Sequence, residues 1–404
     1  MPKKQRYKKF APRNILAYVL KEERRSSILI LIAAVSALII ANSAWSEAYF
    51  SFLQHKITLG SVTLDVQHWI NEGLMAIFFL VVVLEIKREF IDGELRSWRK
   101  ASFLVFCSLG GMIVPALIFS VINPFPPQNT GWAIPMSTDT AIALGVIGLL
   151  GKSIPRSLKI FLLAIAIIDD IVSIIVIGLY YSRPTNMLFL FVALGLTLLL
   201  VYLRSKKYRV FSFMLVGTAI WYCLLMAGVS GTLAGVVVAA IAPLTTRRSN
   251  AKNLQGTEIV EDMLLPVTAF LIVPIFVFAN AGLNFAEVVL AKGEGLSVFI
   301  GVALGLFIGK PLGIFTAGWI AAQLRIAHKP RAINWNHILG IGFISGIGFT
   351  IAILISDLSY KTMPDLQNAA ILGVFVASCI AGIFGVILLK IANQKLTLDK
   401  TRRS

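Results

Sequence analysis

Stretches of about 17–25 mostly apolar residues recur along this chain, and this recurrence strongly limits the folds that it can adopt. Charged residues make up 14% of the 404 residues, whereas a soluble domain carries about 25%. Because a helix satisfies its own backbone hydrogen bonds within a bilayer, the pattern predicts an all-α polytopic membrane protein. We place twelve membrane-spanning helices near residues 27–44, 69–89, 101–123, 131–150, 157–180, 186–203, 209–224, 228–243, 261–283, 296–324, 337–356 and 367–390.

Basic residues divide unevenly between the two sides of the predicted membrane. With the spans crossing alternately, 32 of the 37 Lys and Arg residues fall on the side of both termini. The other side holds Lys56, Arg183, Lys292 and Lys361. By the positive-inside rule, both termini are expected in the cytoplasm. The net charge of +17 therefore reflects topology; it favours contact with anionic membrane lipid and gives no reason to expect a nucleic-acid partner.

The spans divide the chain into three parts. Residues 1–25 form a basic cytoplasmic N-terminal segment, 26–391 the twelve-helix membrane domain, and 392–404 a cytoplasmic tail. Within the outward loop at 45–68, the sequence alternates like two short strands around a Gly-Ser pair suited to a type II′ turn. A plain loop is the alternative. A two-stranded flap on this face could pair with a second subunit.

Four ionisable residues lie deep in the predicted spans: Asp139, Asp169, Asp170 and Lys310. One charged side chain at the centre of a membrane helix costs about 2.5–3.5 kcal/mol on insertion scales, so such residues indicate function. One of the three carboxylates is expected to pair with Lys310, leaving a net negative site for a cation. Asp169 and Asp170 project about 100° apart on a helix, so one can face Lys310 and the other a water-filled cavity.

Two of the apolar runs contain features that interrupt a helix. In residues 131–141, Pro135 removes a backbone donor, and hydroxyls such as that of Thr138 can satisfy the freed backbone groups. Residues 342–350 contain Gly342, Gly346 and Gly348. Close helix packing through Gly342 and Gly346 is an alternative explanation. Interrupted hydrophobic segments in the two halves of a transporter indicate its binding site.

Oxygen ligands in this region suit a hard monovalent cation such as Na⁺. Carboxylates, the Thr138 hydroxyl and unwound backbone carbonyls would supply them. Removal from water favours the neutral form of a carboxylate, so a buried Asp can hold either a proton or a sodium ion. Competition of both ions for one site that opens alternately to each side is antiport, and it requires no cofactor.

Other classes of membrane protein fit the sequence less well. An intramembrane aspartyl protease needs two facing carboxylates, but its usual Gly-x-Gly-Asp motif is absent. A sodium-coupled solute symporter would need a roomier polar site than these few polar residues provide, and a channel is similarly disfavoured. We therefore expect a secondary transporter rather than an enzyme.

Several motifs, in this order, resemble those of the NhaA-type sodium/proton antiporters of bacterial inner membranes. They lie at residues 69–76, 84–89, 131–145, 166–170, 278–282, 308–313 and 346–350, and the resemblance extends from about residue 13 to 390. It implies twelve helices and a homodimer in which the outward hairpin takes part. It also implies an inverted repeat of three-helix units, of which this family is a standard example.

The resemblance further implies roles for the deep residues. Asp170 matches the main ion ligand, while Asp169 matches its neighbour, which lies beside the residue matching Lys310. Thr138 and Asp139 match a broken fourth helix that crosses a broken eleventh, where charges offset opposed half-helix ends. The implied activity is electrogenic exchange of Na⁺ or Li⁺ for protons.

The family is regulated by pH through charges at the cytoplasmic mouth. The residues that match this cluster are Glu85, Arg88, Glu89 and Glu261. Without the resemblance, an ordinary cytoplasmic rim of charges would explain them equally well. Ser230 stands where well-known members carry His, so the resemblance does not fix the pH at which this chain is active.

Overall fold

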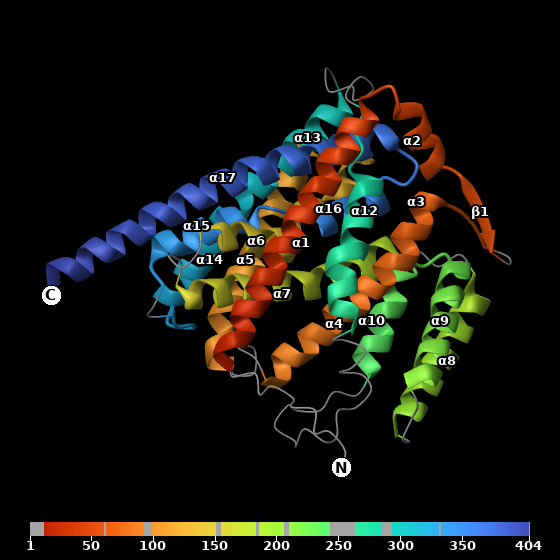
Figure 1. Cartoon of the computed structure of the whole chain (residues 1–404), viewed down its shortest axis with the longest axis horizontal. Helices are drawn as coiled ribbons and strands as arrows, with labels where there is room; N and C mark the ends of the chain where they lie inside the picture. Colours follow the sequence, from red (N-terminus) through yellow and green to blue (C-terminus); the bar gives the residue numbers. More distant parts are fainter. Residues whose placement is uncertain are drawn as a thin grey trace, which may run out of the picture.

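Long apolar helices pack side by side in the computed structural model of the chain (Figure 1). The structure describes residues 12–59, 62–92, 98–150, 155–182, 186–205, 210–242, 263–284, 293–330 and 333–403. In chain order the helices are α1 (Pro12–Ala41), α2 (Ser46–Leu53), α3 (Val66–Trp69), α4 (Met75–Asp92), α5 (Trp98–Ile122), α6 (Thr140–Leu149), α7 (Arg156–Val176), α8 (Met187–Ser205), α9 (Val210–Met226), α10 (Thr232–Ile241), α12 (Val273–Asn280), α13 (Glu294–Leu304), α14 (Lys310–Gln323), α15 (Trp335–Ser345), α16 (Phe349–Ser359) and α17 (Pro364–Arg403).

Short segments of different pitch join or extend several of these helices. Four are π-helical: η1 (Ile70–Leu74), η6 (Ile177–Tyr181), η7 (Thr268–Ile272) and η8 (Gly305–Gly309). Two are 3₁₀-helical: η3 (Gln128–Gly131) and η4 (Ile134–Met136). Single π-helical turns within α-helices are frequent at functional sites, and η8 ends directly before Lys310.

The described residues contain seven helices that are long and apolar enough to cross a membrane, or nine if each of two bent pairs counts as one span. The bent pairs are α1 with α2, at 115°, and α15 with α16, at 47°. α9 and α10 are apolar but shorter. Every predicted span contains helix, although the fourth becomes α-helical only at Thr140. The count of twelve membrane crossings stays a prediction.

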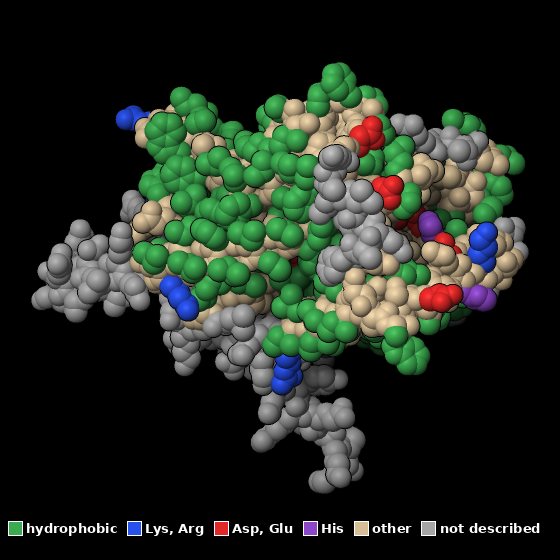
Figure 2. Space-filling model, turned by 90° about the horizontal axis from the view of Figure 1, so that it is seen from above, with side chains coloured by type: hydrophobic (Ala, Val, Ile, Leu, Met, Phe, Trp, Pro, Cys, Tyr) green, Lys and Arg blue, Asp and Glu red, His purple; other side chains and the backbone are tan. Residues whose placement is uncertain are grey.

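Hydrophobic side chains gather over the left and middle of the face shown in Figure 2, whereas the acidic side chains and His on this face lie in its right half. α8 and α9 expose large apolar side chains to the surroundings, such as Leu188 at 69% and Phe211 at 77%. A soluble protein rarely exposes continuous apolar surface of this kind, whereas helices that face lipid do so.

The predicted hairpin is confirmed. β1 (Lys56–Leu59) and β2 (Val62–Asp65) pair antiparallel, with Ile57 opposite Leu64 and Thr58 opposite Thr63. The hydroxyl oxygens of the two threonines lie 3.0 Å apart. The turn itself lies outside the described residues. We call the end of the molecule that carries these strands the hairpin end.

Two helices extend into the terminal segments assigned from the sequence. α1 begins at Pro12, within the predicted N-terminal segment, and α17 continues to Arg403, through the predicted tail. In Figure 1, the last part of α17 projects beyond the neighbouring helices.

α5 and α14 lie against each other without intervening side chains. A Cβ atom added to Gly313 would lie 2.0 Å from the carbonyl oxygen of Gly110, and one added to Gly110 would lie 2.3 Å from the carbonyl oxygen of Gly313. Small residues permit such close backbone contact between membrane helices. The contact fixes α14, which begins with Lys310, against the helix that carries Ser108.

We predict that Gly313→Ala lowers the stability of the folded protein, since the added methyl group would meet backbone that cannot rotate away. Overpacking of this kind costs about 1–3 kcal/mol. Gly195→Ala is the matched control, because a Cβ atom there would meet no atom within 4 Å. The measurement is the thermal unfolding midpoint in detergent. Equal midpoints for the two variants would contradict the prediction.

Candidate ion-binding site

The two predicted helix interruptions lie against each other. α15 ends at Ser345 and α16 begins after a three-residue break, while the chain before α6 is extended at Ser137 and Asp139. The backbone N–H of Asp139 donates to the carbonyl oxygen of Ile347 at 2.6 Å. The Thr138 hydroxyl lies 2.9 Å from the carbonyl oxygen of Ser345. Each interruption thus satisfies backbone groups that the other leaves without a helical partner.

The Asp139 carboxylate connects the starts of two helices. Its Oδ1 accepts a hydrogen bond from the backbone N–H of Ile142 in α6 at 2.9 Å. Its Oδ2 accepts one from the backbone N–H of Thr350 in α16 at 3.1 Å. Helix N-termini carry partial positive charge and free N–H groups. A single buried carboxylate therefore stabilises both.

Lys310 pairs with Asp169 in the interior. The Nζ atom lies 2.6 Å from Asp169 Oδ2, and the two side chains are 0% and 1% exposed. Lys310 also donates to the carbonyl oxygen of Met136, where η4 ends. Ser108 Oγ donates to Asp169 Oδ1 at 2.5 Å, and Thr138 Oγ1 lies 2.8 Å from Asp169 Oδ2. Both oxygens of Asp169 thus have hydrogen-bond partners within the protein.

Asp170 has a different environment from its neighbour. It is 7% exposed, and its Oδ1 atom is buried with no hydrogen-bond partner in the described part of the chain. The charged groups that act on it are Asp169, Glu85, Asp139 and Lys310. Asp170 thus has an acceptor atom that no protein group uses, in a region where Lys310 already neutralises one carboxylate.

The described residues contain no cluster of three or more His, Cys, Asp and Glu side chains that could hold a metal ion. A cation at Asp170 would therefore need hydroxyl, carbonyl or water oxygens to complete its ligands. The crossing of the two interruptions contains carbonyl oxygens at or beyond the end of regular helix, such as those of Ser345 and Ile347, and oxygen ligands of this kind suit a hard cation.

Comparison with known proteins decides the family. The sequence matches the family model described as Na⁺/H⁺ antiporter 1 over residues 17–389. It is 41% identical over 396 residues to the Na⁺/H⁺ antiporter NhaA of Caulobacter vibrioides, covering 96% of this chain and 94% of the relative. It is 42% identical over 385 residues to that of Haemophilus ducreyi, covering 93% and 96%. The chain belongs to the Na⁺/H⁺ antiporter 1 family.

Membership of this family, together with the apolar helices, makes the chain a multi-pass membrane transporter and not an enzyme.

The sequence offered two explanations for the glycines of residues 342–350, a break in the helix and close helix packing, and the structure contains examples of both. Gly346 and Gly348 lie in or beside the break, whereas Gly342 packs within α15, where an added Cβ atom would lie 2.7 Å from Cα of Pro311.

Three of the four residues predicted to regulate the antiporter, Glu85, Arg88 and Glu89, lie on α4. Glu85 is exposed and interacts electrostatically with Arg88 and Glu89, which are half-buried. Glu261 lies outside the described residues. Glu85 is also among the charges that act on Asp170, so this part of α4 is within electrostatic reach of the deep carboxylates.

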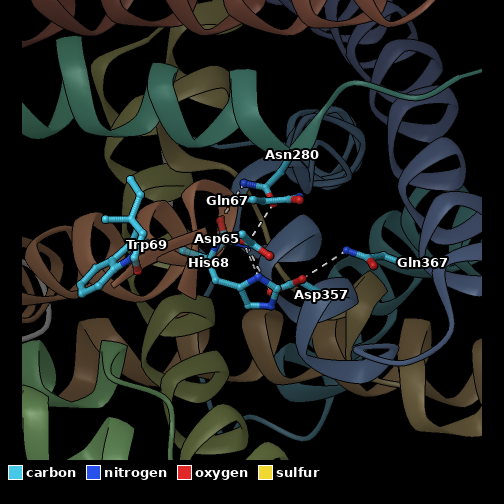
Figure 3. A network of polar contacts seen from close by, with 9 residues as sticks. Asp65, Gln67, His68, Trp69, Asn280, Asp357 and Gln367 are labelled. Atoms are coloured by element: carbon cyan, nitrogen blue, oxygen red, sulfur yellow. Dashed lines mark hydrogen bonds and ion pairs between the residues drawn. The ribbon is translucent and has the colours of Figure 1, made fainter. Parts of the chain in front are cut away.

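A second polar network, not predicted from the sequence, lies at the hairpin end (Figure 3). Asn71 and Asn280 exchange side-chain hydrogen bonds of 3.1 and 2.8 Å, and Asn71 also donates to Asp357 Oδ2 at 3.2 Å. Gln67 donates to Asn280, and Gln367 to Asp357 Oδ1. The network connects the start of the second span with α12, α16 and α17.

Breaking the central ion pair should destabilise the antiporter, because the remaining charge would be buried without its partner. Removing one member of a buried pair costs about 3–5 kcal/mol in water-soluble proteins. We predict that Lys310→Ala lowers the thermal unfolding midpoint in detergent strongly, and that adding Asp169→Asn restores part of the loss.

The matched control is Lys390→Ala, which removes an exposed lysine from α17. A double variant that unfolds no later than Lys310→Ala would show that the pair does not account for the effect.

Proposed function

We propose that this chain exchanges Na⁺ or Li⁺ for protons across the bacterial inner membrane, and that both ions compete for Asp170. The observation that carries the proposal is the buried Oδ1 atom of Asp170, which has no hydrogen-bond partner in the described part of the chain. The neighbouring Asp169 is engaged by Lys310. The printed names of the relatives, Na⁺/H⁺ antiporter NhaA, support these two ions.

Competition follows from the chemistry of one carboxylate. A deprotonated Asp170 attracts a cation, whereas a protonated Asp170 offers no net charge to hold it. If the site opens to one side at a time, each ion can leave only when the other replaces it. Asp169 and Thr138 are proposed as further oxygen ligands. The Thr138 hydroxyl has one proton for two nearby acceptors, so a lone pair stays available for a cation.

Asp139 and Lys310 are proposed to compensate charge rather than to carry ions. Asp139 lies at two helix N-termini, and Lys310 at the carbonyl end of η4. Their opposite charges offset the partial charges of the interrupted helices. Without this compensation, the interruptions would leave partial charges buried among apolar side chains.

The topology that we propose has twelve spans, an inverted repeat and both termini in the cytoplasm. The division of Lys and Arg, 32 against four, supports the placement of the termini. The contact between interruptions in the fourth and eleventh predicted spans supports a repeat that relates two three-helix units. The basic side would then face the anionic lipid of the inner leaflet.

We also propose regulation by pH through Glu85, Arg88, Glu89 and Glu261. The electrostatic interaction of Glu85 with both Asp170 and its neighbours on α4 supports this role. A change in protonation at the mouth would alter the potential at the deep site.

Asp170→Asn tests the main proposal, because the amide keeps the volume but neither carries charge nor binds a proton at neutral pH. We predict that it abolishes exchange in proteoliposomes driven by an imposed pH gradient, with the folded protein retained. Asp365→Asn, an exposed position at the start of α17, is the control.

In the parent protein, the apparent Na⁺ affinity should fall as pH falls, approaching about tenfold per pH unit where the site is mostly protonated.

Exchange at the parent rate by folded Asp170→Asn protein would refute the role of this residue. A Na⁺ affinity that is independent of pH would refute the competition of the two ions.

A homodimer joined through the hairpin is the remaining proposal. Lys56 lies opposite Asp65 in the strand pairing, so residues 57–64 can be replaced by two glycines without separating the chain ends. We predict that this replacement lowers the dimer fraction in detergent, measured by native mass spectrometry, while exchange persists. Thr58→Ala, which keeps the strands, is the control, and an unchanged dimer fraction would remove the role of the hairpin.

A further inference from the structure

Two buried side-chain oxygens on α7 have no hydrogen-bond partner in the described part of the chain. One is Oδ1 of Asp170 and the other is Oγ of Ser173, a side chain that is 1% exposed. A serine within a helix usually donates to the carbonyl oxygen four residues earlier, but Ser173 makes no such bond. Leaving a buried hydroxyl unpaired is costly. The hydroxyl is therefore available to a group that the protein itself does not provide.

The position of Ser173 on α7 relates it to both deep carboxylates. α7 is regular from Arg156 to Val176, and the π-helical segment begins only at Ile177. At about 100° per residue, Ser173 lies about one turn further along the helix than the two carboxylates. Viewed down the helix axis, its direction falls between theirs, about 40° from Asp169 and about 60° from Asp170. Side chains three and four residues apart are neighbours, with Cβ atoms about 5–6 Å apart. Ser173 therefore lies over the gap between the two carboxylates.

The two oxygens differ in what they offer a cation and a proton. Asp170 supplies charge to both, since it can bind a sodium ion or become protonated. A hydroxyl oxygen adds a ligand for a hard cation, whereas a proton already bound to a carboxylate gains little from it. A neighbouring hydroxyl thus raises the affinity for the metal ion more than that for the proton.

We propose that Ser173 is a ligand for the transported Na⁺ or Li⁺ and acts together with Asp170. Its hydroxyl oxygen contacts the ion while its proton turns towards Asp169 or the helix backbone. This inference rests on the proposed role of Asp170 and adds to it a residue that sets the preference of the site for alkali cation over proton.

The experiment is calorimetric titration of the purified full-length chain with NaCl and with LiCl at several pH values, at constant ionic strength. Ser173→Ala removes the hydroxyl, and Ser173→Cys keeps the size but supplies a soft sulfur, a poor partner for a hard cation. Both variants should bind Na⁺ about fivefold or more weakly at every pH. Ser378→Ala is the matched control, because Ser378 is a buried serine on α17 with no side-chain partner among the described residues.

The pH dependence separates a ligand from a structural residue. In both variants the pH at which protons begin to compete should stay at its parent value, because proton binding at Asp170 is unchanged. Parent Na⁺ affinity in Ser173→Ala would overturn the inference, and so would an equal loss in Ser378→Ala or a shifted onset of proton competition. Failure of the proposed function would appear separately, as parent Na⁺ binding by Asp170→Asn.

Discussion

The ion pair between Lys310 and Asp169 is the interaction on which the interior of this antiporter depends. Its charges lie 2.6 Å apart with almost no exposure, so removing either one would leave the other buried without its partner. The pair joins α14 to α7, and the hydroxyls of Ser108 and Thr138 add α5 and the first interruption. Because Lys310 is engaged by Asp169, the adjacent Asp170 keeps an unused acceptor atom. Two neighbouring carboxylates thus acquire different environments from a single cation.

The crossing of the two interruptions provides hydrogen-bond partners for backbone groups that lie outside helices within the membrane. Backbone groups outside a helix must find partners within the protein, because lipid offers none. Here the partners are mutual: Asp139 donates its N–H to Ile347 and accepts from two helix starts through its side chain. The same residue therefore satisfies backbone donors, offsets two helix dipoles and holds the interruptions together. The interruptions thus place carbonyl oxygens at or beyond the end of regular helix at their crossing, such as those of Ser345 and Ile347.

Much of this arrangement could be predicted because its residues are unfavourable in an apolar membrane span and therefore indicate a special role. Charged residues and helix breakers are expensive in apolar spans, so Asp139, Lys310 and the interruptions stand out from the sequence. The partner of Lys310 could not be chosen from spacing alone, since Asp169 and Asp170 differ only in direction on a helix whose rotation is set by packing. Ser108 was missed because a serine in an apolar run equally suits close packing. The network of Asn71, Asn280 and Asp357 was missed because Asn71 lies 209 residues from Asn280 and 286 from Asp357 along the chain.

That network has a consequence for how the hairpin end can come apart. Asn71 and Asn280 each donate a side-chain hydrogen bond to the other, and Asn71 also donates one to Asp357. These hydrogen bonds are therefore not independent of one another. Moving α16 or α12 away alone would leave amide groups unsatisfied in a poorly hydrated region, which is costly for each group. Separation is therefore cooperative: either the helices stay joined, or water enters and all three side chains change partners together. Coupling of this kind disfavours partly separated arrangements, and across a membrane with unequal ion concentrations, fewer such arrangements mean less leakage of ions.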